Sequence, residues 1–299
     1  MHLQLTDCDW QLQLISLYCW IDEGFEQRGW DSLCERFSPN SNPKFCDAEV
    51  LSVYLFARLR GHHTVKHARQ FVQDFASNYF PRLPKYSAFV DRLNRLQHVL
   101  VQALQECTVF VGAESNLKCV IDSCPIVMAS SKRSGRARVA PKLASPGRCA
   151  TKSQYYYGVK LHVVGILRAG TIPFPVLVGV SAARLSDLKG LQACQDALAG
   201  QTLYADLAYK CKQTHKHLEG IGGCLVTGHK KNRWYHSCAG PCTASRTVSS
   251  RRQPIESLFA WLQEKTRFQN ASRVRSEAGL LVFVWSALLI GALLLSTPD

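Results

Sequence analysis

Three acidic residues, far apart in the sequence, are the main candidates for chemistry in this chain. Asp122 and Asp206 each come at the end of a short apolar run that is expected to form a strand, and Glu256 lies in a segment with helical spacing. If the fold brings these carboxylates together, their mutual repulsion requires a cation to hold them. The three acids are therefore predicted to form one metal-binding site.

The chemistry of such a site follows from its ligands. Three carboxylates supply hard oxygen atoms, which suit Mg²⁺ or Mn²⁺ better than Zn²⁺. Two such ions about 4 Å apart can activate a water molecule or a 3′-hydroxyl and stabilise the leaving oxygen at phosphorus. We therefore predict that Asp122, Asp206 and Glu256 are both metal ligands and catalytic residues, with Mg²⁺ as the cofactor and Mn²⁺ as an alternative.

The charge of the chain favours a polyanionic partner. The formal net charge is +14 and the pI is about 9.3, and nucleic acid is the commonest partner of such proteins. Asp and Glu are absent from residues 123–186 and 220–255, two stretches that contain many Lys and Arg and that adjoin predicted acids. The alternative is a basic soluble protein that has no role with nucleic acid.

Each acid also has a simple structural explanation. An aspartate at the end of a strand is often a turn or capping residue, so the prediction depends on the order of the elements that carry the three acids. Asp187 is the main rival acid. Its place in the segment Leu185-Ser186-Asp187-Leu188 favours the N-terminus of a helix over a role in catalysis.

The segments that carry the acids follow the order strand, strand, strand, helix, strand, helix, strand, helix. The strands are expected at 118–122, 155–164, 175–180, 202–205 and 222–227, with a polar, basic loop over 129–153. Three strands in a meander followed by two crossover strands form the ribonuclease H-like arrangement, an α/β fold with a mixed five-stranded sheet flanked by helices. In this arrangement the first and fourth strands are neighbours, so Asp122 and Asp206 can face each other.

Residues 1–112 have helical patterns and are predicted to form a separate N-terminal region, followed by a catalytic domain over 113–299. Phe89, Leu93, Leu96, Leu100 and Leu104 form one apolar stripe, which predicts a single long helix. The N-terminal region either binds DNA ends or forms a structural helical cap, and the pattern fits both functions.

The apolar run Leu280–Leu295 is 16 residues long, short of the roughly 20 that a membrane span needs. We expect a buried helix that packs on the catalytic domain, with a membrane protein as the alternative. The 13 cysteines are irregularly spaced, and the N-terminus lacks the pattern of a signal peptide. We therefore expect reduced thiols and a cytoplasmic protein.

The basic loop near residues 229–242 is a candidate DNA contact. Lys230, Lys231, Arg233 and Trp234 combine positive charge with a ring on which a base can stack, so all four are predicted to contact DNA. The alternative is an exposed loop that packs its own aromatic side chains. Zinc binding is not expected, because the Cys and His residues here lack a paired Cys-x-x-Cys spacing. These residues are Cys224, His229, His236, Cys238 and Cys242.

Lys160 and His162 alternate along a predicted strand and therefore share one face of the sheet. If that face meets the acids, both side chains are predicted to contact the phosphates of DNA. If it does not, they are solvated strand residues.

Four motifs follow one another in the expected catalytic domain: Val120–Pro125, Tyr156–His162, Leu203–Lys210 and Arg252–Phe259. With them the chain resembles the DDE transposases of bacterial insertion sequences, whose catalytic core is ribonuclease H-like. The resemblance implies that the three acids are the metal-binding triad. It also implies an endonuclease that cleaves double-stranded DNA at element ends and transfers the strand to target DNA, acting as a homo-oligomer.

The third motif and the fourth depart from the pattern of many relatives. A Lys that often follows the second acid is replaced by Leu207, and the Lys position seven residues after Glu256 holds Gln263. Arg252 fills the Arg position one helical turn before Glu256. On a continuous helix Arg267 returns to the Glu256 face, so Arg252 and Arg267 are the predicted phosphate contacts. These departures leave two alternatives open, a ribonuclease H-like nuclease without strand transfer and a non-catalytic DNA-binding relative.

Overall fold

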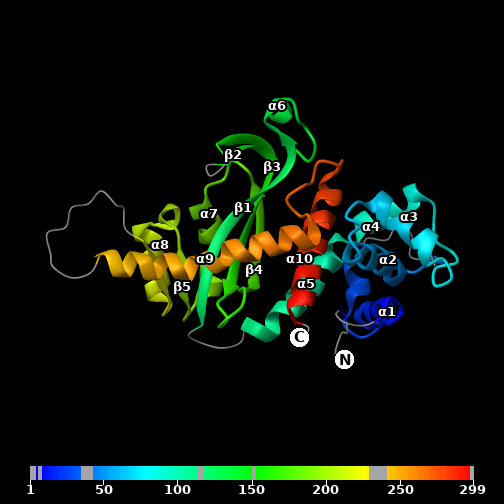
Figure 1. Ribbon diagram of the computed structural model, residues 1–299, viewed down its shortest axis with the longest axis horizontal. Coiled ribbons are helices and arrows are strands. Elements are labelled where there is room, and N and C mark those ends of the chain that lie inside the picture. Colours follow the sequence, from blue (N-terminus) through cyan, green and yellow to red (C-terminus); the bar gives the residue numbers. More distant parts are fainter. Residues whose placement is uncertain are drawn as a thin grey trace. The chain divides into compact units, whose positions relative to one another are not determined.

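The computed structural model describes residues 5, 9–34, 43–112, 117–149, 153–228 and 241–296. Figure 1 shows the chain, which divides into two compact units. The sheet unit is Thr108–Trp261, and the helical unit combines Met1–Cys107 with Leu262–Asp299. The helical unit therefore contains the C-terminal part of the chain, which the sequence had assigned to the catalytic domain.

The sheet unit is built on a mixed sheet. Its strands are β1 (Lys118–Ser130), β2 (Ser145–Cys149), β3 (Gln154–Ile166), β4 (Phe174–Ala182), β5 (Thr202–Ala205) and β6 (Cys224–Thr227). The path runs β2-β3-β1-β5-β6, and β4 also pairs with β3. β1 is antiparallel to β3 and parallel to β5, which in turn is parallel to β6. The predicted ribonuclease H-like order is thereby confirmed, including the neighbouring positions of β1 and β5.

Two strands differ from the prediction. β1 does not end at Asp122 but continues to Ser130, so the acid lies in the interior of a 13-residue strand. Its second half alternates between buried and half-buried residues and pairs with the equally long β3. β2 forms within the segment that was expected to be a loop, because it pairs along the other edge of β3. Long cross-strand pairing thus extends β1 beyond the strand end that was predicted at Asp122.

Alternation along β1 separates two faces of the sheet. Cys119 and Ile121 point into an apolar cluster with Val164 of β3 and Leu191, a residue of α7 (Asp187–Gln192). The same cluster includes residues of η2 (Gln195–Leu198), η3 (Leu207–Tyr209) and α8 (Lys212–Gly220). We call this side the α7 face.

The opposite side is the α9 face, named for α9 (Pro241–Thr266), which runs across the strands in Figure 1. The Cδ1 atom of Ile255 lies within van der Waals distance of the position that a Cβ on Gly165 would take. Gly165 stands between Val164 and Ile166, which both belong to the α7 face. By the same alternation Asp122 belongs to the α9 face and its neighbour Ser123 to the α7 face.

The helical unit has the following elements: α1 (Trp10–Glu26), η1 (Trp30–Leu33), α2 (Asp47–Leu59), α3 (Val65–Phe75), α4 (Tyr86–Arg95), the first part of α5 (Gln97–Gly112), the end of α9 and α10 (Glu277–Ser296). The predicted long helix is in fact two, because the chain leaves the helical conformation at Leu96 between α4 and α5. All five residues of the predicted apolar stripe are nevertheless buried.

α10 is 20 residues long, so by length and composition it could cross a membrane, and the length argument against a span does not hold. Its burial is more informative, because 67% of its most apolar window lies inside the structure, as in a core helix of a soluble protein. Arg58 of α2 binds this helix. Its fully buried guanidinium donates to the Phe283 carbonyl at 2.9 Å and to the Ser286 hydroxyl at 2.8 Å.

Candidate active site

The centre of the candidate site is a guanidinium between two aspartates. Nη2 of Arg252 lies 3.6 Å from Oδ2 of Asp122, and Nη1 lies 3.5 Å from Oδ1 of Asp206. The three residues come from α9, β1 and the end of β5. The parallel pairing of β1 with β5 brings the two acids side by side, and the packing of α9 supplies the cation.

Asp122 is the more buried of the two acids, with 23% of its side chain exposed against 51% for Asp206. Burial raises the pKa of Asp122 to about 6, and the nearby charges of Asp187 and Asp206 act in the same direction. The backbone N–H of Ser123, which donates to Oδ1 of Asp122 at 2.8 Å, and the charge of Arg252 oppose this rise. A further positive charge beside Asp122 would therefore stabilise its ionised form.

Asp206 follows directly after β5 and caps the short helix η3. Its Oδ1 accepts a hydrogen bond from the backbone N–H of Leu207 at 2.7 Å. The capping contact fixes the carboxylate at the C-terminal end of a parallel strand, next to β1. η3 also carries the buried Tyr209, whose pKa is raised by burial and by the carboxylates of Asp122 and Asp187.

Glu256, the third predicted acid, lies on α9 one helical turn after Arg252 and is exposed. Within the described ranges, no three Asp, Glu, His or Cys side chains are close enough together to hold a metal ion. The structure thus brings Asp122 and Asp206 to one cation, while Glu256 lies on the same helix as Arg252, four residues after it. Two hard carboxylates that already share one positive charge fit a divalent metal, because they repel each other without a cation.

A second polar group lies on the α7 face. Nζ of Lys160 donates to Oδ1 of Asp187 and to the Leu185 carbonyl, each at 2.9 Å. The hydroxyl of Ser123 donates to the same Oδ1 of Asp187 at 2.6 Å. Burial alone would raise the pKa of Asp187, but the hydrogen bonds from Ser123 and Lys160 outweigh it and hold the pKa below its usual value. We call Ser123, Lys160 and Asp187 the α7-face network.

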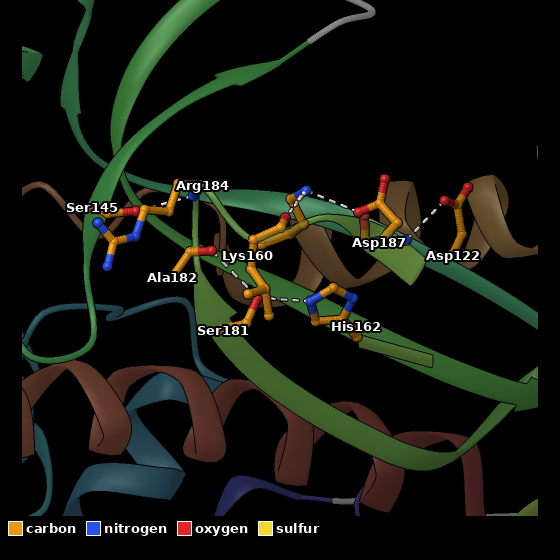
Figure 2. Close-up of polar contacts among 10 residues, drawn as sticks. Asp122, Ser145, Lys160, His162, Ser181, Ala182, Arg184 and Asp187 are labelled. Atoms are coloured by element: carbon orange, nitrogen blue, oxygen red, sulfur yellow. Dashed lines mark hydrogen bonds and ion pairs between the residues drawn. The ribbon is translucent and has the colours of Figure 1, made fainter. Parts of the chain in front are cut away.

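His162 is part of the packing beneath α7. Only 7% of it is exposed, and its Nε2 is 2.8 Å from the Ser181 hydroxyl (Figure 2). A Cβ on Gly190 would overlap the imidazole ring, so α7 approaches the sheet closely at this point. Burial lowers the pKa of His162 to about 4, so the ring is neutral at physiological pH.

These positions correct the predictions for Lys160 and His162. The register pairs Ser123 with His162 and Pro125 with Lys160, so both side chains lie on the α7 face and not beside Asp122. Lys160 is engaged by Asp187, and His162 is buried. Period-two spacing correctly placed the two residues on one face. The geometry does not favour direct phosphate contact by either of them.

The other predicted DNA contacts have different outcomes. Lys230, Lys231, Arg233 and Trp234 lie outside the described residues, as do His229, His236 and Cys238 of the zinc alternative. α9 ends at Thr266, and Arg267 has a left-handed φ of 50°. The argument that a continuous helix returns Arg267 to the Glu256 face is therefore wrong.

Sequence reasoning missed two residues of this region. Ser123 had no assigned role. Asp187 was correctly predicted to start a helix, since α7 begins there, but its bonds to side chains of β1 and β3 were not predicted. The sequence did contain a signal for this pair. Residues 123–186 hold no Asp or Glu, so Asp187 is the first acid that follows Lys160 in the chain.

Comparison with known proteins gives the family. Residues 112–277 match the model of a family described as a transposase DDE domain. A search of curated proteins finds no match. The matched segment contains Asp122, Asp206 and Glu256 and covers more than half of the chain, and the mixed sheet with parallel β1 and β5 agrees with such a core. The chain belongs to the transposase DDE domain family.

Proposed function

We propose that this transposase cleaves DNA at the ends of a bacterial insertion sequence and transfers the freed strand into target DNA. The observation that carries the proposal is the convergence of Asp122 and Asp206, from adjacent parallel strands, on one guanidinium. Two carboxylates held together in this way are suited to a divalent cation and to phosphodiester chemistry.

DDE transposases generally use divalent metal ions. In this chain the ligands would be Asp122, Asp206 and Glu256, with Mg²⁺ as the metal and Mn²⁺ as an alternative. When bound, the metal would supply Lewis-acid stabilisation of the charge that develops at phosphorus. Glu256 is exposed on the helix that carries Arg252, so its side chain is free to turn toward the aspartates.

The protein's own residues would act on charge and position. Arg252 offsets part of the charge of the two aspartates, and with a metal ion held by them its guanidinium would be available for a DNA phosphate. The predicted phosphate contact of Arg252 is therefore proposed for the metal-bound protein. Lys230, Lys231, Arg233 and Trp234 are proposed to contact DNA, and Arg267 is proposed as a further phosphate contact without the helical-face argument.

The helical unit is proposed to bind the element ends. Lys66, Arg82 and Lys85 are exposed on or beside α3 and α4. Arg69 of α3 donates to the Pro84 carbonyl at 2.7 Å, which ties α3 to the segment that precedes α4. The basic charge suits a DNA backbone. We further propose that the protein acts as a homo-oligomer in the bacterial cytoplasm and that its partner is double-stranded DNA.

The experiment uses purified full-length protein, Mg²⁺ and DNA that carries the sequences flanking the gene. Asp122→Asn, Asp206→Asn and Glu256→Gln should each lower cleavage at least about 100-fold. Asp196→Asn changes an exposed acid of the same unit and should cleave like the wild type. Equal cleavage by Asp122→Asn would refute the site. Cleavage without strand joining would identify a nuclease, and DNA binding without cleavage would identify a non-catalytic relative.

A further inference from the structure

The α7-face network connects directly to the acid pair through one residue. Ser123 donates its hydroxyl to Asp187 at 2.6 Å and its backbone N–H to the Asp122 carboxylate at 2.8 Å. Because neighbouring residues of a strand point to opposite faces, Ser123 is held on the α7 face while Asp122 points to the α9 face. The orientation of Asp122 therefore depends on contacts that lie on the far side of the strand.

Asp187 is itself firmly placed. Its Oδ1 accepts from Ser123 of β1 and from Lys160 of β3, so one oxygen joins two strands to α7. The exposed fractions of the Lys160 and Asp187 side chains are only 16% and 28%, which makes the pair less screened by solvent than a surface pair. The close packing of Gly190 on His162 holds the rest of α7 against the same strands.

We propose that Asp187 is a positioning residue which, through the Ser123 hydroxyl, fixes the carboxylate of Asp122 for metal binding. The proposal rests on the proposed function in that Asp122 is taken as a metal ligand. Asp187 itself does not touch substrate or metal. Lys160 completes the network by balancing the charge of Asp187, which explains why a basic side chain on this face is bonded to an acid and not left free for DNA.

A network that only stabilised the fold would have a different effect. Its loss would lower stability and leave the metal affinity and the turnover of the folded protein unchanged. A network that orients a metal ligand changes the affinity and turnover themselves, and loss of such supporting contacts typically costs about 10- to 100-fold. The affinity for the metal and the turnover therefore distinguish the two roles.

The test uses a pair of variants with nearly equal shape. Ser123→Thr keeps the hydroxyl, and Ser123→Val replaces it with a methyl group, so the extra methyl that both carry cancels in the comparison. Neither variant removes the partner of Lys160. Asp187→Asn is the third variant, and it keeps an oxygen that can accept from Ser123. Asp187→Ala is avoided as the main test because, unlike Asp187→Asn, it removes the side-chain oxygen that accepts from both Ser123 and the largely buried Lys160.

Two quantities are measured on the full-length protein: Mn²⁺ affinity by titration with electron paramagnetic resonance, and kcat and KM with DNA. Ser123→Val should bind Mn²⁺ about tenfold more weakly and lose about tenfold or more in kcat. Its KM for DNA should stay within about twofold, because the network lies on the face opposite to Asp122. Ser123→Thr should keep the wild-type values, and Asp187→Asn should fall between Thr and Val.

The outcomes separate this inference from the proposed function. Wild-type Mn²⁺ affinity in Ser123→Val, or a loss confined to its melting temperature, would overturn the positioning role. Failure of the wild type to cleave DNA would refute the proposed function alone, since the Mn²⁺ titrations of the Thr and Val variants still decide the role of Asp187. Absence of Mn²⁺ binding in the wild type would overturn the inference, because Asp122 would then not be a metal ligand.

Discussion

Arg252 and Asp122 form an ion pair across the sheet unit, with Nη2 3.6 Å from Oδ2. The same guanidinium reaches Asp206, so a single side chain of α9 offsets two carboxylates that would otherwise repel each other. Asp122 is half-buried and has a raised pKa even with this partner beside it. In the folded protein the acid pair is therefore stabilised by a nearby cation.

Arg252→Gln should make the metal-free protein less stable and more responsive to metal. Loss of the guanidinium leaves Asp122 and Asp206 unneutralised, which we expect to cost about 1 kcal/mol of unfolding free energy for this partly exposed group. Mn²⁺ should recover that loss, so its addition should raise the melting temperature more in the variant than in the wild type. Differential scanning fluorimetry with and without MnCl₂ measures both effects.

Arg251→Gln is the matched control for this variant, because Arg251 is the exposed neighbour on the same helix. It should show the wild-type response to MnCl₂. Equal metal-induced shifts in all three proteins would mean that Arg252 does not occupy the metal position.

His162 should make the protein sensitive to mild acid. The unfolded imidazole has its ordinary pKa of 6.5, whereas burial lowers the folded value to about 4. Between these values the unfolded state binds the extra proton, so the stabilisation is complete above pH 6.5 and is lost as the pH falls toward 4. The loss should reach about 3 kcal/mol.

His162→Gln tests this pH dependence, because a neutral amide can still bond the Ser181 hydroxyl. Urea unfolding from pH 7 to pH 4 should give a curve that is flatter for the variant by about the same amount. Parallel curves for the variant and the wild type would show that His162 does not titrate in this window.

Gly190→Ala should destabilise the sheet unit by about 1–3 kcal/mol, because its Cβ would overlap the His162 ring. Gly135→Ala provides the control, since a Cβ at Gly135 meets open space and the residue already has a helical φ of −71°. Thermal unfolding of the two variants compares the sites directly. An unchanged melting temperature for Gly190→Ala would mean that α7 can move away from His162.

Arg58→Met should weaken the helical unit. The buried guanidinium donates to the Phe283 and Thr266 carbonyls and to the Ser286 hydroxyl, and a thioether cannot replace these bonds. We expect a loss of about 3 kcal/mol, measured by urea unfolding. Arg60→Met, at an exposed position next to the C-terminus of α2, should change stability by less than about 0.5 kcal/mol. Equal effects of the two substitutions would contradict the role of Arg58.

Much of the architecture was predictable from the sequence because it is local. Alternating or continuous apolar runs marked five strands and their order. β2 was missed because its residues Ser145–Cys149 have little strand character, and pairing with β3 is what makes them a strand. The split between α4 and α5 was missed because the apolar stripe continues across Leu96.

The family, the order of the strands and the placement of two acids at adjacent parallel strands were predictable from the sequence, since these follow from local patterns and motifs. Which cation meets those acids, and which face Lys160 and His162 occupy, depended on tertiary packing. A period of two shows that Lys160 and His162 lie on one side of a strand, but the helix that covers that side is set by long-range packing. For the same reason the pairing of Arg252 with Asp122 was not predicted. Asp187 starts a helix as expected, but its bond to Ser123, the neighbour of Asp122, was not predicted either.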